Sequence, residues 1–178
     1  LLHYPVYDKN HRQIATAVTN VDVHDIARLS ATFGVKGFYL VTPVEQQREL
    51  IGEMVGHWTH GVGAEYNPRR KEALELARIV ADLDEVVKQA MALSGCEPVT
   101  IGTGANVKDR MVSFERLSEL LRERDGAAIL VFGTGWGLEK SFFDSLDYIL
   151  EPVRGAGEYN HLSVRSAAAI IVDRLVGR

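Results

Sequence analysis

The sequence predicts one α/β domain over residues 1–178, with a mostly parallel sheet covered by helices on both faces. Short apolar runs typical of buried strands alternate about six times with longer amphipathic runs typical of helices. The length of 178 residues suits one domain and leaves little room for a second. Hydrophobic residues make up 46% and charged residues 25%, as in globular proteins with a large core.

The predicted elements follow one another in a regular order. They are strand 14–19, helix 22–33, strand 37–41, helix 43–55, loop 56–67, strand 77–80, helix 83–93, strand 99–101, helix 113–123, strand 127–132, short helix 138–143, strand 147–150 and helix 163–175. The strands are short apolar runs, and the helices carry apolar residues near helical spacing, as Val23, Ile26 and Ala27 do.

Individual residues indicate where several helices begin or end. Gly34 ends the first helix because glycine adopts the left-handed conformation that follows a helix. Thr42 is expected to cap the second helix, with Pro43 at its first position. Asp82 and Ser113 are expected to cap the helices that follow them.

Composition and charge exclude several classes of protein. Cys96 is the only cysteine, which rules out an intrachain disulfide and predicts a cytoplasmic, reducing environment. No apolar run approaches the ~18 residues of a membrane span, and the first residues do not resemble a signal peptide. The net charge of −4 argues against a surface that coats nucleic acid, but it allows a local basic patch. His57 and His60 lack a third ligand at metal-binding spacing, so we expect no metal.

Glycine clusters follow three predicted strands in the second half of the chain. They are Gly102 and Gly104, then Gly133, Gly135 and Gly137, then Gly155 and Gly157. Ligands of open parallel sheets bind beyond the carboxyl ends of the strands, where glycine lets the backbone approach closely. The clusters therefore indicate a nucleoside-type cofactor site, although each alone is also compatible with a tight turn.

A dinucleotide-binding enzyme is the alternative for these loops. The sequence at 133–137 is G-x-G-x-G, whereas the dinucleotide fingerprint is G-x-G-x-x-G early in the chain. The phosphate-binding sequence G-K-[ST] is absent as well. A Rossmann-type enzyme is thus the less favoured interpretation.

Three sequence motifs, in order, resemble those of the SPOUT (alpha/beta-knot) RNA methyltransferases. Segment 20–35 carries Arg28 on a helix that ends in Phe-Gly-Val, like the first motif. Segment 130–137 is a strand followed by a glycine loop, like the second motif. Segments 148–152 and 159–170 resemble the third and most specific motif, a strand end followed by the opening of the last helix.

This resemblance implies a fold, an activity and partners. The C-terminal part of the chain would form a trefoil knot that binds S-adenosylmethionine, and S-adenosylhomocysteine would be the product. The methyl acceptor would be RNA, either tRNA or rRNA, bound by a homodimer that shares the RNA site. Some relatives of this kind stand beside, or are fused to, a tRNA guanine-N1 methyltransferase.

The resemblance also implies which residues bind the cofactor. They are Thr103, Gly104, Phe132, Gly133, Thr134, Gly137, Ile149, Leu150, Glu151, Pro152, Asn160, Leu162 and Ser163. Leu150 and Leu162 would sandwich the adenine ring, and Asn160 would hold the knotted loop or contact the methionine moiety. Ser163 is equally suited to cap the last helix.

Arg28 and Arg165 are the candidate catalytic residues, Arg28 by its motif and Arg165 by its place one turn into the last helix. Asp22 stands where the family has Asn and would be a base or, preferably, a helix cap. Gly135 stands where the family often has Glu. These differences leave a second hypothesis, a catalytically weak module that binds the cofactor and RNA.

The segment 57–71 is a candidate RNA-binding region. It combines cations with rings that can stack on bases, namely His57, Trp58, His60, Tyr66, Arg69, Arg70 and Lys71. A solvated loop followed by the start of a helix would have the same composition.

Overall fold

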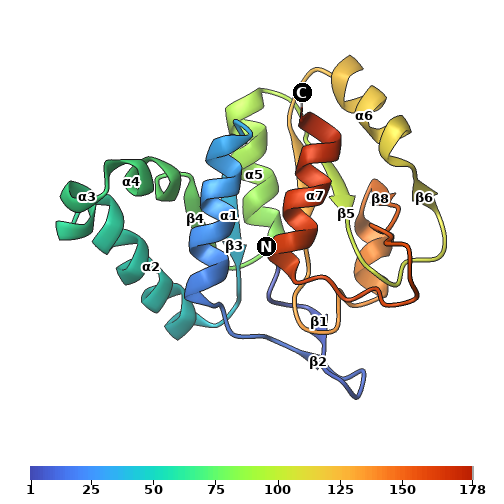
Figure 1. Ribbon diagram of the computed structural model, residues 1–178, viewed down its shortest axis with the longest axis horizontal. Coiled ribbons are helices and arrows are strands. Elements are labelled where there is room, and N and C mark those ends of the chain that lie inside the picture. Colours follow the sequence, from blue (N-terminus) through green and yellow to red (C-terminus); the bar gives the residue numbers. More distant parts are fainter. Residues whose placement is uncertain (178) are drawn as a thin grey trace.

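The computed structural model describes residues 1–177 and shows strands and helices that alternate along the chain (Figure 1). The strands are β1 (Val6–Tyr7), β2 (Gln13–Ile14), β3 (Phe38–Val41), β4 (Ala77–Val80), β5 (Val99–Gly102), β6 (Met111–Val112), β7 (Ala128–Val131) and β8 (Tyr148–Leu150). The helices are α1 (Asn20–Thr32), α2 (Glu45–Thr59), α3 (Val62–Tyr66), α4 (Pro68–Leu74), α5 (Leu83–Ser94), α6 (Phe114–Glu123), the 3-10 helix η1 (Ser141–Ser145) and α7 (Val164–Val176).

The first residues of the chain join two parallel sheets. One sheet has the order β6-β8-β5-β7, and the other pairs β3 with β4. Leu2 forms parallel bridges to both Val41 and Gly133. The Leu2 N–H donates to the Phe132 carbonyl over 2.7 Å, and the His3 N–H donates to the Val41 carbonyl over 2.9 Å. Residues 1–3 therefore lie between β3 and β7 and make one continuous layer.

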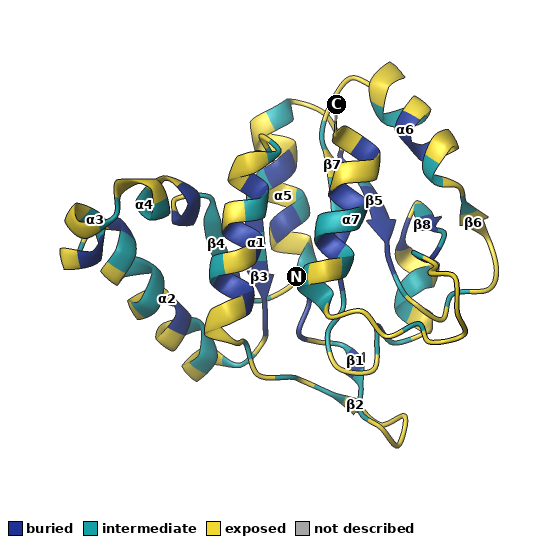
Figure 2. Cartoon of the chain, in the orientation of Figure 1, coloured by how far each residue is buried: buried dark blue, intermediate teal, exposed yellow. Residues whose placement is uncertain are grey.

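Helices cover both faces of this layer. Leu1 packs with α1, α6 and α7, whereas its neighbour Leu2 packs with α5 and η1. In β3, Leu40 packs on the same face as Leu1 and Val41 on the same face as Leu2, because successive side chains of a strand point to opposite faces. Buried positions accordingly concentrate in the central strands and on the inward sides of α1 and α7 (Figure 2). The prediction of a parallel α/β sheet covered on both faces is confirmed.

Most predicted elements are confirmed to within two residues at each end. These are the strands now seen as β3, β4, β5, β7 and β8 and the helices α1, α5, α6 and α7. Two predicted caps are also correct, since Asp82 accepts from the Glu85 N–H over 2.9 Å and Ser113 accepts from the Arg116 N–H over 3.2 Å.

Two predicted elements, strand 14–19 and the short helix 138–143, were wrong at their boundaries. The strand expected at 14–19 contains only Ile14, which pairs in the short hairpin β1–β2. Beyond it the backbone binds elsewhere, because the Thr16 N–H donates to the His3 carbonyl and the Val18 N–H donates to the Gln47 side chain. The 3-10 helix also begins later than predicted, at 141 in place of 138.

The region 42–67 departs most from its prediction. Val44, not Thr42, is the N-cap of α2, and no side chain satisfies that helix start. The expected loop 56–67 is largely helical, as the end of α2 and the whole of α3. Trp58 packs against the core and Thr59 is buried, so tertiary contacts outweigh the weak helix propensity of the glycines.

No helix among residues 1–177 combines the length and apolarity that crossing a membrane would demand.

Candidate functional site

A cleft of about 1190 Å³ lies at the carboxyl ends of β5, β7 and β8. Three loops form most of its wall: 103–110 after β5, 132–138 after β7, and 151–163 between β8 and α7. Their backbones are largely exposed at the lower edge of the molecule (Figure 2). The β1–β2 hairpin adds Tyr7 and His11 to the wall. The glycine clusters therefore meet at one edge of the sheet, as expected for parallel strands.

Every predicted cofactor residue except Leu150 lines this cleft. The lining residues are Thr103, Gly104, Phe132, Gly133, Thr134, Gly137, Ile149, Glu151, Pro152, Asn160, Leu162 and Ser163. The Leu150 side chain is wholly buried in the core beneath α1 and α7. Ile149 lines the cleft and the next side chain of the strand points to the opposite face, so the prediction that Leu150 would contact the adenine was wrong.

The loop after β5 is tied to both of its neighbours. The Thr103 hydroxyl and N–H both donate to the Val131 carbonyl, over 2.9 and 3.1 Å. The Asn160 amide donates to the Ala105 carbonyl over 3.1 Å, which attaches the loop 151–163 to this loop. A Cβ on Gly104 would lie only 3.0 Å from Val107. The sequence-based prediction that Asn160 holds a loop agrees with this hydrogen bond.

The loop after β7 is held by strand β1. The Trp136 N–H donates to the Tyr7 carbonyl, and the Tyr7 N–H donates to the Gly137 carbonyl, each over 3.0 Å. Gly135 has a φ of +58°, and a Cβ there would lie 2.9 Å from the Tyr7 carbonyl oxygen. Glycine is therefore required by both the backbone conformation and the close approach of β1.

The loop between β8 and α7 contacts the start of α6 at its first residue and caps α7 at its last residue. The Glu151 carboxylate accepts from the Phe114 N–H over 2.8 Å, at the start of α6. The Ser163 hydroxyl accepts from the Ser166 N–H over 3.2 Å and caps α7. The cap predicted for Ser163 is thus confirmed, and the same residue faces the cleft.

Arg165 brings a positive charge into the cleft and is held by two carboxylates of α1. Its guanidinium lies 2.6 Å from the Asp22 carboxylate and 3.3 Å from that of Asp25. Asp22 is buried and also accepts from the Thr19 hydroxyl over 2.6 Å. Thr19 caps α1 by accepting from the Asp22 N–H. The preferred prediction that Asp22 itself is the cap was therefore wrong, since Asp22 lies in the first turn as the partner of Arg165.

Arg28 does not line the cleft. It is exposed on α1, and its carbonyl accepts from the Thr32 hydroxyl within that helix. Arg28 follows Asp25 by three residues, about one helical turn, and Asp25 is the second carboxylate that Arg165 contacts. Of the two predicted catalytic arginines, Arg165 lines the cleft and Arg28 does not.

The predicted RNA-binding segment 57–71 lies away from the cleft, on α2, α3 and α4 at the opposite end of the molecule (Figure 1). Trp58 is half-buried there, with the Arg70 guanidinium 4.6 Å from its ring centre and the rings of His24 and His57 at its edges. Trp58 and Arg70 therefore stabilise the packing of these helices. Tyr66 is exposed but stands far from the other site residues.

His3 is a buried polar residue behind the cleft that no sequence pattern singled out. Its Nδ1 lies 3.0 Å from the Thr16 hydroxyl, which in turn lies 2.5 Å from the Thr134 hydroxyl in the cleft wall. Its Nε2 is buried without a hydrogen-bond partner among the described residues. Burial lowers the pKa of His3 to about 4, so the imidazole is neutral near neutral pH.

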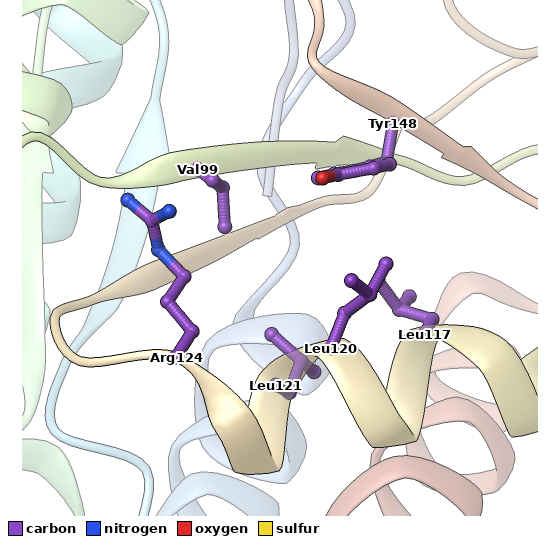
Figure 3. A pocket seen from close by; sticks show the side chains of 6 residues that line it. All are labelled: Val99, Leu117, Leu120, Leu121, Arg124 and Tyr148. Carbon is purple, nitrogen blue, oxygen red and sulfur yellow. The ribbon is translucent and has the colours of Figure 1, made fainter.

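A second cavity, of about 90 Å³, lies between α6 and the strands β5 and β8 (Figure 3). Its lining is mainly apolar: Val99, Leu117, Leu120, Leu121, Arg124 and Tyr148. The cavity is far below the several hundred Å³ typical of a cofactor pocket. Among residues 1–177, no three His, Cys, Asp or Glu side chains are grouped as metal ligands would be.

Comparison with known families identifies the protein. A family model described as SAM-dependent RNA methyltransferase matches residues 1–177. The chain belongs to this family. S-adenosylmethionine is therefore the cofactor, and the resemblance found from the three motifs is confirmed at the level of the family. The alternative of a dinucleotide-binding enzyme is not supported.

Curated relatives of this chain differ in length. The chain is 44% identical over 177 residues to a tRNA (guanine-N(1)-)-methyltransferase of Oleidesulfovibrio alaskensis, covering 99% of the chain but 41% of that protein. It is 40% identical over 178 residues to an uncharacterized protein of Aquifex aeolicus and covers 87% of it. The chain thus spans about two fifths of the length of the relatives that carry the tRNA methyltransferase name.

Solved structures share the fold of the methyltransferase at low sequence identity. TrmJ from Z. mobilis is 18% identical, with a TM-score of 0.58 over 90% of this chain and 65% of TrmJ. The SpoU methyltransferase AviRb from Streptomyces viridochromogenes, solved with AdoMet, is 18% identical, with a TM-score of 0.56 over 90% of this chain and 56% of AviRb. These similarities support the fold assignment.

Proposed function

We propose that this methyltransferase transfers the methyl group of S-adenosylmethionine, bound in the cleft at β5, β7 and β8, to an RNA. The proposal is carried by the convergence of the three loops on one cleft. Transfer RNA is the first acceptor to test because two relatives are named as tRNA methyltransferases, and rRNA is the second. The guanine-N1 specificity in those names is not transferred, since the chain spans 41% of each relative.

The residues of the cleft fit this cofactor. The glycine loops expose backbone N–H and C=O groups that can hydrogen-bond the edge of an adenine. Ile149, Pro152 and Leu162 offer apolar surface for the faces of the ring. Bound there, the cofactor would supply an electrophilic methyl group on a sulfonium.

The chain itself would contribute alignment and charge. An in-line displacement depends on the approach of acceptor and methyl group, which rigidly held loops favour. Thr103 and Asn160 hold two of those loops by hydrogen bonds to neighbouring backbone. Arg165, held by Asp22 and Asp25, would present its remaining N–H groups to the acceptor as hydrogen-bond donors.

Further features of the family complete the proposal. We infer that residues 1–178 act as one methyltransferase unit, because residues 1–3 join the two halves of the sheet. The passage of the loop 151–163 against the loop 103–110, marked by Asn160 and Ala105, supports a trefoil knot there. A homodimer is proposed because Arg28 is exposed outside its own cleft, where a second subunit could use it. The lone exposed Cys96 suits a cytoplasmic location.

Two measurements on the purified chain test this function. Calorimetric titration with S-adenosylhomocysteine should give one-to-one binding per chain, and NAD should not bind. Incubation with methyl-labelled S-adenosylmethionine should then label total tRNA in preference to rRNA. Folded protein that binds neither S-adenosylhomocysteine nor S-adenosylmethionine would contradict the proposal.

A binding module without efficient catalysis is the second candidate function. It is favoured by the position of Arg28 outside the cleft and by the pairing of Arg165 with two carboxylates. Arg28→Ala discriminates between the two functions. If Arg28 is catalytic, the variant should keep the affinity for S-adenosylhomocysteine and lose methyl transfer. No methyl transfer by the unmodified chain, with cofactor and RNA both bound, would favour the module.

A further inference from the structure

Trp136 is a large aromatic side chain exposed in the wall of the cofactor cleft. It belongs to the glycine loop after β7, and 61% of its surface is exposed. The other tryptophan, Trp58, is half-buried beneath Arg70 and contacts two histidine rings. Single exposed apolar residues are common on proteins. Trp136 differs from these because it lines a cleft, where a bound molecule would cover its ring.

Hydrogen bonds hold the backbone around Trp136, whereas its indole ring is exposed. The Trp136 N–H and the Gly137 carbonyl both pair with Tyr7 of β1, each over 3.0 Å. The Gly137 N–H donates to the Thr134 carbonyl over 3.0 Å and closes a tight turn around Trp136. Gly135 and Gly137, on either side, both have positive φ. The loop thus presents the indole from a held backbone, so a partner that stacks on it loses less ordering entropy.

Lysine side chains lie on the rim of the same cleft. Lys108 belongs to the loop after β5, Lys140 follows the loop after β7, and both are exposed. Over the described range 1–177, neither has a carboxylate within 4.0 Å, unlike Arg110, which lies 2.5 Å from Asp144. In a chain of net charge −4, these two lysines on the rim of the cleft that Trp136 lines favour a polyanion that carries planar groups.

The size of the cleft leaves room for such a partner. Its volume of about 1190 Å³ exceeds the roughly 300–1000 Å³ of pockets that hold one small ligand. A methyl acceptor must enter the same space as the cofactor for the two to react. A nucleotide taken out of its stack meets this need, with its base on an aromatic ring and its phosphates near the lysines.

We propose that Trp136 stacks on an unstacked nucleobase of the RNA substrate, at or beside the methylated nucleotide, with Lys108 and Lys140 near its phosphates. This inference rests on the proposed RNA methyltransferase function and adds a residue that positions the acceptor. In this proposal Trp136 contacts the RNA and not the cofactor. Removal of the ring should therefore lower the affinity for RNA and leave the affinity for S-adenosylhomocysteine unchanged.

The first test measures affinity in the variants Trp136→Ala and Trp136→Phe, with Leu93→Ala as the control. Leu93 is 67% exposed on α5 and does not line the cleft. Loss of one base–aromatic stack, about 1–3 kcal/mol, corresponds to about 5- to 150-fold weaker binding of total tRNA by Trp136→Ala. Trp136→Phe should fall between this variant and the unmodified chain, and Leu93→Ala should bind tRNA normally.

The second test uses fluorescence, since the chain has only two tryptophans. Trp58→Phe leaves Trp136 as the only tryptophan. With excitation at a wavelength that tyrosine does not absorb, total tRNA should quench the Trp136 emission as stacking occurs. Trp136→Phe leaves Trp58 alone, and its emission should not change. Circular dichroism establishes that both variants are folded before titration.

Three results would overturn the inference. They are unchanged tRNA affinity in Trp136→Ala, unquenched Trp136 emission at saturating tRNA, or a parallel loss of S-adenosylhomocysteine affinity that makes Trp136 a wall of the cofactor site. Failure of the unmodified chain to bind S-adenosylhomocysteine is a separate result, and it counts against the proposed function itself.

Discussion

Asp22 and Arg165 form an ion pair between the first and the last helix. The Arg165 guanidinium lies 2.6 Å from the Asp22 carboxylate. Asp22 is buried, and a buried carboxylate needs a charged or hydrogen-bonded partner. Arg165 and the Thr19 hydroxyl supply both. The negative charge of Asp22 is therefore matched by a cation in the first turn of α7.

Asp22→Asn tests this pairing, because it keeps the shape of the side chain and removes its charge. We expect the free energy of unfolding to fall by about 2 kcal/mol, between the values for exposed and fully buried pairs. Urea denaturation measures the change. The control is Glu72→Gln, which breaks the exposed pair with Arg69 and should cost about 0.5 kcal/mol or less. Equal effects in the two variants would show that Asp22 and Arg165 do not stabilise the fold.

His3 predicts how stability depends on pH. Its pKa is about 4 in the folded chain and about 6.5 when unfolded. Between these values only the unfolded state binds the proton, so the free energy of unfolding should fall by about 1.4 kcal/mol per unit as pH decreases. Above pH 6.5 the contribution is complete.

The measurement compares the unmodified chain with His3→Gln in urea at pH 7 and pH 5. The variant should lose less stability over this interval, because Gln does not titrate. The pKa of His24 is also lowered by burial, but His24 is present in both proteins and its effect cancels in the difference. Parallel pH dependences would contradict the assignment.

At the scale of elements, α6 and α7 begin with the same cap but differ in position. Ser113 and Ser163 each accept from the N–H three residues on, over 3.2 Å. Replacement of either by alanine should cost about 1 kcal/mol of stability. Ser163 also lines the cleft, whereas Ser113 does not. We therefore expect Ser163→Ala alone to weaken S-adenosylhomocysteine binding in calorimetry. Equal cofactor affinity in the two variants would restrict Ser163 to the cap.

The elements that could be predicted from the sequence are those whose pattern is local. Strand β7 is a continuous apolar run, and α5 has a capping Asp82 at its start. The β1–β2 hairpin has strands of two residues, too short for any alternation to be visible. Helix α3 depends on contacts made by the neighbouring Trp58, so its glycines wrongly indicated a loop.

The site was predictable to a similar degree and for similar reasons. Loops that follow parallel strands must meet at one edge, so their residues could be placed together before the fold was known. Leu150 was misplaced because the face of a strand is set by its register in the sheet. Tyr7 reaches the cleft, and His3 lies behind it, through the path of the first residues, which no local pattern marks. Arg28 does not line the cleft, which its place in the first motif did not indicate.

At the scale of the whole molecule, a substitution at Leu2 tests whether residues 1–3 hold the two sheets together. Its side chain is 2% exposed and packs with Val41, Val86 and Val131. Leu2→Ala should cost about 2–5 kcal/mol through lost contacts and the cavity left behind. Leu50→Ala, at a site 61% exposed, should change stability by about 0.5 kcal/mol or less. Denaturation that leaves Leu2→Ala as stable as Leu50→Ala would exclude a central role for residues 1–3.

The place of residues 1–3 between β3 and β7 also governs the order of events in folding. Leu2 pairs with Gly133, so one of the most central contacts joins points about 130 residues apart in the chain. During synthesis, the first residues must wait beside β3 until β7 has left the ribosome. Contacts of such long range slow folding and keep a strand edge open in the meantime. Within residues 1–177, the N-terminal residues are thereby among the last to be fixed in place.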